Sequence, residues 1–390
     1  MLTTRPIYLD YNATTPVDPA VIEAMEPFLR QHFGNASSAH SYGHTAHEAL
    51  ARARGQVASL LGADPGEIVF TGSGSEANNL ALKGVVFDAL SKAQGADLHI
   101  VTSAIEHPAL AATCRFLRRL GCDVTTVPVD RYGALDLDAL EAALARRTLL
   151  VSVMHANNEV GTVAPIRQVA DLAHEHGALV HTDAAQSVGK IGVNVDELGV
   201  DLLTLAGHKL YAPKGIGALY VRRGVALEPL VHGGGQEGGR RAGTENVPYA
   251  VGLGTACEIA EHGLPEATDQ LADMSGRLWR GLEGALAERV VLNGHPSDRL
   301  PNTLNVSFLG QNGAQLLARV PEIAASTGAA CHEADAGVSS VLGAMGVSPE
   351  RVRGAIRLSA GRFTTAAEVD QAADLLASRA GTVHRAVVHA

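Results

Sequence analysis

Long apolar runs, basic clusters and paired cysteines are all missing from this sequence of 390 residues. No apolar run approaches the ~20 residues that a helix needs to cross a bilayer, so we expect no membrane association. The first ten residues lack the apolar core of a secretory signal peptide and soon reach a charged aspartate. Because the net charge is -10, the phosphate backbone of nucleic acid would be repelled. We therefore expect no nucleic acid partner.

Cysteine is scarce as well. The four cysteines, Cys114, Cys122, Cys257 and Cys331, are widely separated and include no CxxC pair. Their spacing argues against a zinc knuckle and against a disulfide framework. Free thiols are typical of a reducing compartment, so we expect a cytoplasmic protein. Metal-site spacings such as HExxH are also absent from the sequence, and we predict no metal site.

The first two-thirds of the chain contain short β-rich runs that alternate with segments of helical spacing, such as Ile166–His176. Some of the runs, including Leu149–Met154, are apolar almost throughout, which suits strands covered on both faces. This alternation predicts an α/β fold with a mostly parallel, seven-stranded sheet flanked by helices. The predicted strands are Glu67–Thr71, Leu98–Ser103, Asp123–Val129, Thr148–His155, Ala178–Asp183, Asp201–Ala206 and Ile216–Arg222.

The last third of the chain differs in character. Long helical patterns follow the glycine-rich stretch His232–Thr244, and a short predicted strand, Thr303–Phe308, comes later. The closing helix begins with a capping box over Thr365–Glu368. We therefore expect two domains. They are a large domain over residues 15–257 and a smaller α+β domain, which carries the Cys331 loop, over residues 1–14 and 258–390.

Polar residues cluster directly after the predicted strands. Ligands of an open α/β sheet bind outside the carboxyl ends of the strands, so these clusters predict one shared site. The clusters are Ser73-Gly74-Ser75, Glu106-His107, Asn157-Asn158, Asp183 with Gln186, and His208-Lys209.

The run Thr71–Asn79 leaves a predicted strand and opens a helix. Its small residues let the backbone approach an anion, and the N–H groups of a helix start can bind phosphate. An ordinary strand-to-helix turn capped by serine explains the run equally well. The run matches neither GxxxxGK[ST] nor GxGxxG.

Lys209 and Asp183 both follow predicted strands. A lysine in that position is most often a solvated surface charge. A lysine that forms a Schiff base, combined with an aspartate against a pyridinium nitrogen, is however what proteins supply to pyridoxal-phosphate chemistry. The pair favours a pyridoxal-phosphate site.

His107 and Arg357 each allow two interpretations. An imidazole after a strand can stack on a pyridine ring and carry protons near neutral pH, or it can be an ordinary satisfied histidine. Arg357 lies between apolar neighbours, where its guanidinium needs an anion. That anion is either a substrate carboxylate, which suits its two-pronged geometry, or the partner in an internal salt bridge.

Cys331 lies in the small, glycine-containing and partly charged run Ser326–Gly337, which reads as a loop. A thiol there is accessible as a nucleophile. The other three cysteines lie in helical or apolar surroundings, where we expect inert thiols.

Taken together, these motifs resemble the cysteine desulfurase family of fold-type-I pyridoxal-phosphate enzymes, of the NifS/IscS type with the class V aminotransferase fold. The resemblance extends along essentially the whole chain. Its motifs are Tyr8–Pro16, Ser103–His107, Met154–Gly161, His181–Lys190, Gly207–Lys209, Gly233–Asn246, the Cys331 loop and Ile356–Thr365.

The resemblance implies pyridoxal phosphate as the cofactor. Lys209 would form the Schiff base, Asp183 would pair with the pyridine nitrogen, and His107 would stack on the ring. Gln186 would hydrogen-bond the ring hydroxyl. The remaining cofactor-binding residues implied by the resemblance are Gly74, Ser75 and His208 at the phosphate, Asn158 beside the ring, and Thr244, which would reach across from the second subunit of a homodimer.

The resemblance also implies a substrate site and a reaction. Asn12, Asn158 and Arg357 would bind the substrate, L-cysteine. Cys331 would attack its sulfur, releasing alanine and leaving a persulfide for a sulfur-acceptor protein. The acceptor could be an iron–sulfur scaffold, a tRNA-modifying protein or a biosynthetic enzyme.

Some positions depart from the family pattern. Ala206 stands where many relatives have a serine that contacts the phosphate, and Tyr211–Lys214 has alanine where glycine is usual. The segment Gly328–His332 is also similar to the selenocysteine lyase branch, whereas the spacing from Cys331 to the next helix fits the longer-loop desulfurases. We favour cysteine as the substrate and keep L-selenocysteine as the alternative.

Two other classes of protein compete with this interpretation. A metal hydrolase could use the side chains of His107, His181, Asp183 and His208, but no metal-site spacing supports it. A non-catalytic sulfur-binding or scaffold protein could keep the fold alone. The joint presence of Lys209, Asp183 and Cys331 speaks against that.

Overall fold

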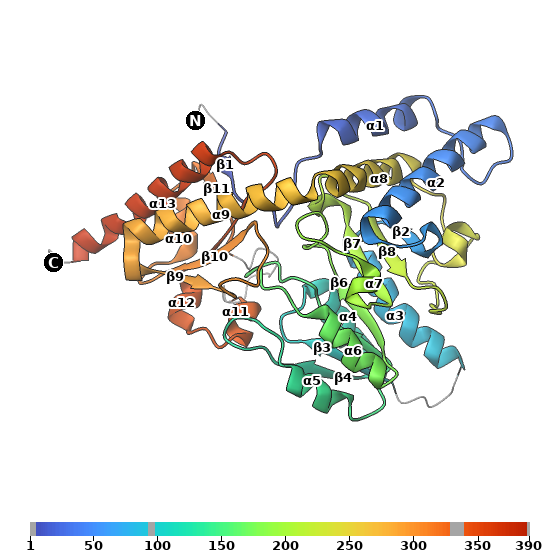
Figure 1. The fold of residues 1–390 in the computed structure, drawn as a ribbon, viewed down its shortest axis with the longest axis horizontal. Helices are drawn as coiled ribbons and strands as arrows, with labels where there is room; N and C mark the ends of the chain where they lie inside the picture. Colours follow the sequence, from blue (N-terminus) through green and yellow to red (C-terminus); the bar gives the residue numbers. More distant parts are fainter. Residues whose placement is uncertain (1–4, 93–97, 328–338, 388–390) are drawn as a thin grey trace.

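A computed structural model describes residues 5–92, 98–327 and 339–387 of the chain, with side chains up to residue 381. The molecule is elongated, with a large sheet and its helices at one end and a smaller sheet with two long helices at the other (Figure 1). Within the described residues, no helix is long and apolar enough to cross a membrane.

The large sheet has seven strands in the order β2-β8-β7-β6-β5-β3-β4. All neighbours are parallel except β8, which runs antiparallel to both β2 and β7. The predicted α/β fold with a mostly parallel seven-stranded sheet is therefore confirmed. The strands are β2 (Ile68–Thr71), β3 (His99–Ser103), β4 (Asp123–Val127), β5 (Leu150–Ser152), β6 (Leu179–Asp183), β7 (Leu202–Ala206) and β8 (Gly217–Val221).

The strand that is shortened most, relative to its predicted range, is β5. β5 ends at Ser152, although apolar residues continue to Met154. Beyond that point the chain still follows β6, because Val153 N donates to His181 O at 3.1 Å and His155 N donates to Asp183 O at 3.0 Å. It then turns into the Asn157 loop, so the ladder ends early.

Helices cover both faces of the large sheet. Successive residues of a strand point to opposite faces, so strands that are apolar throughout need packing partners on each side. Ile100 of β3 belongs to one buried cluster, and its neighbour Val101 belongs to another. One face is covered by α2 (Ser41–Leu61), α5 (Leu137–Leu144), α6 (Ile166–Glu175) and α8 (Val247–His262), and the other by α3 (Gly74–Lys92) and α4 (Pro108–Arg119). The short α7 (Val195–Leu198) and α1 (Pro19–Arg30) complete this part of the chain.

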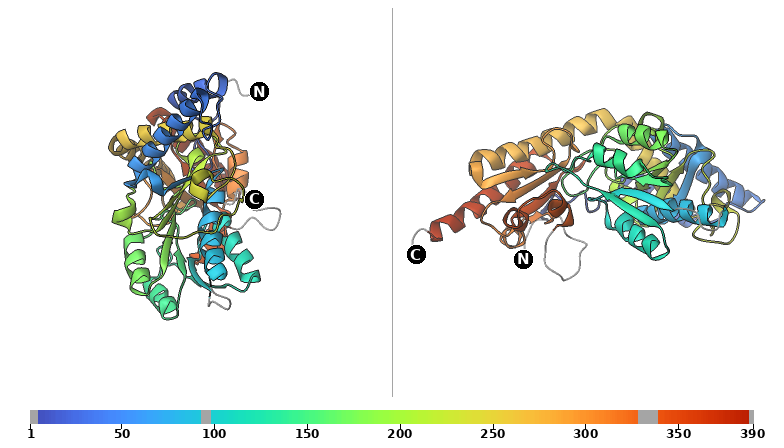
Figure 2. Two further views of the ribbon diagram at one scale, coloured as in Figure 1. Left: turned by 90° about the vertical axis from the view of Figure 1, so that its right-hand side faces the viewer. Right: turned by 90° about the horizontal axis from the view of Figure 1, so that it is seen from below.

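The smaller part has its own hydrophobic core. Its antiparallel sheet has the order β12-β10-β9, and α9 packs beside α13 (Figure 1; the same part of the chain is seen from two other sides in Figure 2). The predicted strand Thr303–Phe308 is confirmed as β10. The remaining elements are α9 (Leu264–Leu286), β9 (Val290–Asn293), α10 (Gly313–Ala318), α11 (Ser340–Ala344), α12 (Pro349–Arg353), β12 (Ala355–Ser359) and α13 (Ala366–Val387).

The predicted capping box before α13 is present. Thr365 N donates to Glu368 Oε2 at 2.8 Å, and Glu368 N donates to Thr365 Oγ1 at 3.3 Å. Each side chain thereby satisfies a backbone N–H that has no partner within the helix.

The two cores meet where α8 is followed by α9. Cys257 and Ala260 of α8 lie in the core of the large sheet, whereas Leu271 of α9 lies in the second core. The division of the chain into two domains stays a prediction, and this packing favours a junction at Gly263. The N-terminal segment joins the smaller part through β1 (Ile7–Tyr8), which pairs with β11 (Ile323–Ala324).

Candidate active site

A cavity of about 260 Å³ lies at the carboxyl ends of the large sheet and is closed on one side by residues of the smaller part. Of the predicted site residues that the structure describes, all except Thr244 line it. The lining comprises Asn12, Ala13, Ser73, Gly74, Ser75, Asn78, Glu106, His107, Pro108, Met154, Asn158, Glu159, Asp183, Ala185, Gln186, Ala206, His208, Lys209, Ser340, Val341 and Arg357.

The N-terminus of α3 forms one wall of the cavity. Ser73 Oγ accepts a hydrogen bond from Glu76 N at 3.1 Å, which fixes the first turn of the helix. A Cβ on Gly74 would lie 2.9 Å from the Cβ of Ala206, so only glycine fits where α3 approaches the end of β7. The start of a 19-residue helix is able to bind a phosphate group through its backbone N–H groups.

Asp183 is buried at the end of β6. Its Oδ1 accepts a hydrogen bond from Ala185 N at 3.0 Å, and its Oδ2 accepts one from Asn78 Nδ2 at 2.7 Å. The Oδ1 of Asn78 is buried and has no hydrogen-bond partner. The sequence interpretation missed Asn78, although helical spacing could have found it, since it lies one turn after Gly74 on the same face of α3.

His107 caps the N-terminus of α4, and its Nδ1 accepts a hydrogen bond from Ala109 N at 3.2 Å. This bond places the proton of the neutral ring on Nε2. Glu106 precedes it, and its Oε1 accepts from Ser103 Oγ at 2.5 Å and from Met154 N at 2.9 Å. Its Oε2 is buried without a partner. Burial raises the pKa of Glu106 to about 8, so this carboxyl is largely protonated at neutral pH.

Lys209 ends a single 3₁₀ turn, Gly207–Lys209, that follows β7. Its Nζ donates to the carbonyl oxygens of Asn12 at 2.6 Å and Ala13 at 2.8 Å. His208 Nδ1 lies 3.2 Å from Thr14 Oγ1. Burial, reinforced by the charge of Lys209, lowers the pKa of His208 to about 4, which keeps its imidazole neutral.

Arg357 enters the cavity from β12 of the smaller part and is 4% exposed. One nitrogen, Nη2, pairs with Asp10 Oδ1 at 2.7 Å, and Nη1 donates to Asn158 O at 3.0 Å. Its Nε is buried without a partner. The internal salt bridge considered from the sequence therefore exists, yet the guanidinium also lines the cavity.

The metal hydrolase hypothesis fails on the position of His181. Its ring lies inside the sheet between Ser152 Oγ at 2.7 Å and Thr204 Oγ1 at 3.1 Å. Burial lowers its pKa to about 4. It does not line the cavity that holds His107 and Asp183.

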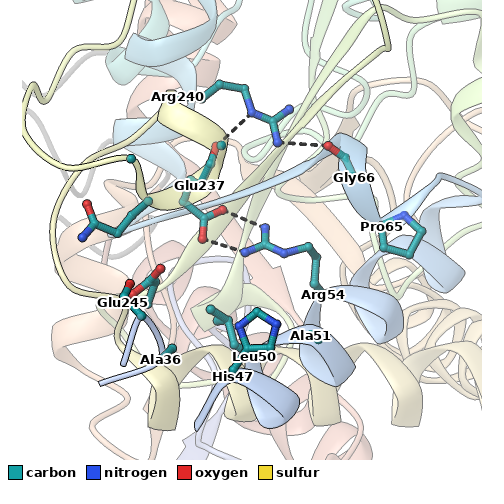
Figure 3. Close-up of a pocket in the computed structure, with 14 residues that line it drawn as sticks. Ala36, His47, Leu50, Ala51, Arg54, Pro65, Gly66, Glu237, Arg240 and Glu245 are labelled. Atoms are coloured by element: carbon teal, nitrogen blue, oxygen red, sulfur yellow. Dashed lines mark hydrogen bonds and ion pairs between the residues drawn. The ribbon is translucent and has the colours of Figure 1, made fainter. Parts of the chain in front are cut away.

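Thr244 does not line this cavity. It is exposed and borders a neighbouring hollow, together with Arg241 and Phe70. The loop that carries it is fixed by Glu237, whose carboxylate receives two bonds of 2.7 Å from Arg54, as Figure 3 shows. Glu237 also accepts from Phe70 N at 2.8 Å. The open pocket drawn in Figure 3, of about 690 Å³, lies on the same side of the molecule.

Cys331 lies outside the described residues. The residues on either side of its segment are attached to the walls of the cavity. Ser326 pairs with Arg357, whose N donates to Ser326 O at 2.6 Å, and Ser339 Oγ donates to Glu159 Oε2 at 2.5 Å.

The other three cysteines are buried and free, as predicted. Burial raises the pKa of Cys114 to about 12 and that of Cys122 to about 11, and it also raises the pKa of Cys257. Thiols with such pKa values are rarely ionised at neutral pH, which makes them poor nucleophiles.

A strand-end lysine, a buried strand-end aspartate and a helix N-terminus around one cavity define a pyridoxal-phosphate enzyme built on an open α/β sheet. The aminotransferase class-V family model matches residues 7–372. The chain belongs to this family and, within it, to the cysteine desulfurases. The family resemblance and the fold-type-I architecture predicted from the sequence motifs are thereby confirmed.

Three similar proteins illustrate this relationship. A cysteine desulfurase IscS from Dictyoglomus turgidum is 45% identical over 374 residues, which cover 95% of this chain and 94% of the relative. The solved structure of a NifS-like protein has a TM-score of 0.88 at 38% identity and covers 97% of this chain and 99% of its own. The structure of SspA in complex with cysteine has a TM-score of 0.81 at 39% identity, with coverage of 92% and 100%.

Proposed function

We propose that this protein removes sulfur from L-cysteine, gives L-alanine, and holds the sulfur as a persulfide on Cys331. The observation that carries the proposal is the meeting of Lys209, Asp183, His107 and Arg357 in one cavity. The alternative substrate, L-selenocysteine, is not favoured, because the curated relatives are named cysteine desulfurases.

The residues around the cavity fit pyridoxal phosphate. Two buried polar atoms at its wall, Asn78 Oδ1 and Arg357 Nε, have no partner in the protein, and such atoms are usually satisfied by a ligand or by water. Lys209 would attach the cofactor covalently, with Asp183 at the ring nitrogen and His107 against the ring. The start of α3, at Gly74 and Ser75, and His208 would hold the phosphate, and Gln186 the ring oxygen.

When bound, pyridoxal phosphate withdraws electrons from the substrate carbon next to the amine. The protein's own residues do the rest. Asn78 and Ala185 N hold the Asp183 carboxylate in one orientation through two hydrogen bonds, in which it would pair with the ring nitrogen of the cofactor. His107, with its ring proton on Nε2, is able to carry a proton into the cavity.

Arg357, Asn158 and Asn12 would bind the substrate from the side of the smaller part. A guanidinium grips a carboxylate through two parallel N–H groups. A substrate whose carboxylate is bound there would have its sulfur at a set distance from the wall formed by Ser340 and Val341. These two residues follow the Cys331 segment in the sequence.

The sulfur transfer conserves atoms and electrons. The thiolate of Cys331 attacks the substrate sulfur, the S–S bond of the persulfide forms as the C–S bond breaks, and the carbon keeps the bonding electrons and takes up a proton to become alanine.

We further propose a homodimer, in which Thr244 of the partner chain reaches the phosphate, and a sulfur-acceptor protein that takes the persulfide sulfur.

The direct test is alanine formation from L-cysteine by the purified protein supplied with pyridoxal phosphate, compared with Lys209→Ala. We expect the wild type to be yellow and to form alanine, and the variant to lose both properties, because the described cavity contains no second lysine on its wall. Borohydride reduction that attached the cofactor to another lysine would overturn the site assignment.

A further inference from the structure

Lys190 is a buried lysine whose burial the proposed reaction does not explain. It lies four residues after Gln186 and is 6% exposed. Among the residues that the structure describes, no carboxylate forms an ion pair with it. Burial lowers the pKa of Lys190 well below its ordinary value, and the positive charges of Lys209 and Arg357 lower it further. Since a buried lysine without a counter-charge costs stability, its presence calls for a reason.

Two cavity amides accept hydrogen bonds from Lys190. Its Nζ donates to Gln186 Oε1 at 2.8 Å and to Asn12 Oδ1 at 3.2 Å. Lys190 itself does not line the cavity, whereas Gln186 and Asn12 do. Lys190 therefore stands behind the two amides.

A carboxamide has an acceptor end and a donor end, so a bond to the oxygen decides where the NH₂ group points. With its oxygen held by Lys190, Gln186 turns its Nε2 the other way, toward Asn12 O at 3.0 Å. The same carbonyl oxygen accepts the Nζ of Lys209 at 2.6 Å. The donor end of Gln186 is thus kept beside the reactive lysine.

Asn12 is oriented in the same manner. Its Oδ1 also receives Asn302 Nδ2 at 3.0 Å, and its own Nδ2 donates to Thr303 Oγ1 at 2.8 Å. Since Thr303 and Asn302 fix Asn12 as well, Gln186 is the amide that depends most on Lys190.

We propose that Lys190 is a positioning residue, which holds the Gln186 amide with its NH₂ group toward the cavity, so that the site offers a donor to an anionic oxygen of the bound cofactor. The proposal rests on the proposed pyridoxal-phosphate site. Without Lys190, the bond from Gln186 Nε2 to Asn12 O alone distinguishes the two ends of the amide, so the Gln186 oxygen turns toward the cavity more often and repels an anionic oxygen there.

Lys190→Met tests this role, because methionine keeps a long side chain and removes the donors. One lost neutral hydrogen bond corresponds to about a tenfold change in an equilibrium. We expect reconstituted Lys190→Met to bind pyridoxal phosphate about tenfold more weakly. The pH midpoint of the bound cofactor's visible absorbance should rise by about one unit, because the ring oxygen loses the Gln186 donor that Lys190 positions and so binds its proton more tightly.

The charged groups around Lys190 are Lys209, after β7, and Arg357, from β12, whose charge is paired with Asp10. Lys209, Arg357 and Asp10 all remain in the variant, so a shifted pH midpoint reports the loss of Lys190. The matched control is Lys92→Met, at the exposed far end of α3, which should leave the binding constant and the midpoint unchanged.

A double-mutant cycle with Gln186→Met separates positioning from a merely structural role. If Lys190 acts through Gln186, the double variant should bind cofactor no more weakly than Gln186→Met alone. Additive losses, or wild-type binding and midpoint in Lys190→Met, would overturn the proposal. If Lys190→Met does not fold, Lys190→Leu, which also removes the donors, enters the same cycle. A wild-type protein that bound no pyridoxal phosphate would instead refute the proposed function, and this proposal with it.

Discussion

Glu106 is a carboxyl whose burial couples folding to pH. Its pKa rises from 4.5 to about 8 in the folded protein, so between these values the folded state holds a proton that the unfolded state has released. Its contribution to stability is therefore present at low pH and is lost as pH rises toward 8. Glu106→Gln mimics the protonated acid. We expect the free energy of unfolding of the variant to fall less between pH 5 and 8, with a gain on the order of a few kcal/mol at pH 8.

Urea unfolding at pH 5, 6, 7 and 8 measures this difference, with exposed Glu26→Gln as the control. Parallel pH profiles for wild type and Glu106→Gln would show that the carboxyl is ionised in the folded protein.

Cys331 separates sulfur transfer from cofactor binding. Cys331→Ala should lose alanine formation from cysteine almost entirely, because the C–S bond is strong and its cleavage needs a thiolate to take the sulfur. Cofactor binding should be unchanged. Mass analysis of wild type after turnover should find the extra sulfur on Cys331 and on none of Cys114, Cys122 and Cys257, whose buried thiols have raised pKa values. If the variant formed alanine at the wild-type rate, the persulfide on Cys331 would be refuted, and the protein would be a lyase that does not use this thiol.

Residues that follow strands were predictable, and their supporting residues were not. Asp183 and Lys209 follow strands that are visible as apolar runs. Asn78 contacts Asp183, 105 residues away along the chain, and Lys190 contacts Asn12, 178 residues away, besides its near neighbour Gln186. Helical spacing could have placed Asn78 at the cavity, but no local pattern reports the long-range contacts, because they arise only when the sheet brings distant segments together.

At the scale of elements, Arg54 of α2 connects the helix to the loop that carries Thr244. Its bidentate bond to Glu237 is shielded, with side-chain exposures of 18% and 3%. Arg54→Met leaves a buried carboxylate without its counter-charge, so we expect a loss of about 3 kcal/mol in the free energy of unfolding. Exposed Arg30→Met, which breaks the Arg30–Glu26 pair of α1, should cost less than about 1 kcal/mol. Equal costs in urea unfolding would show that the Arg54 pair contributes no more than a surface contact.

The elements themselves differ in how far they could be predicted. Buried runs such as Leu202–Ala206 stand out by composition, and all seven strands of the large sheet were found. The antiparallel direction of β8 was not, since direction depends on the connection and not on the strand's residues. The two-residue strands β1 and β11 are too short to show any periodicity.

For the molecule as a whole, the site depends on both cores. Lys209 comes from the large sheet and Arg357 from the smaller one, while Asn12 contacts residues of both parts. A relative shift of the two parts would therefore separate the lysine from the carboxylate site. The sequence indicated both sets of residues and assigned Asn12 of the N-terminal segment to the substrate site, but it did not indicate that Asn12 bonds to residues of both parts.

The proposed homodimer predicts that two defective chains can complement each other. Lys209→Ala retains Thr244, and Thr244→Val retains Lys209. If Thr244 acts on the partner's phosphate, a heterodimer has one site with both residues intact and one site with neither. Random exchange makes half of the dimers mixed, so about a quarter of all sites should be restored. The measurement is alanine formation at limiting pyridoxal phosphate, after the two variants are unfolded and refolded together, with separately refolded variants mixed afterwards as the control. If Thr244 instead acted on the phosphate of its own chain, every site in the mixture would contain at least one of the two substitutions. Alanine formation no higher than in the control would therefore show that Thr244 does not contribute to the partner's site.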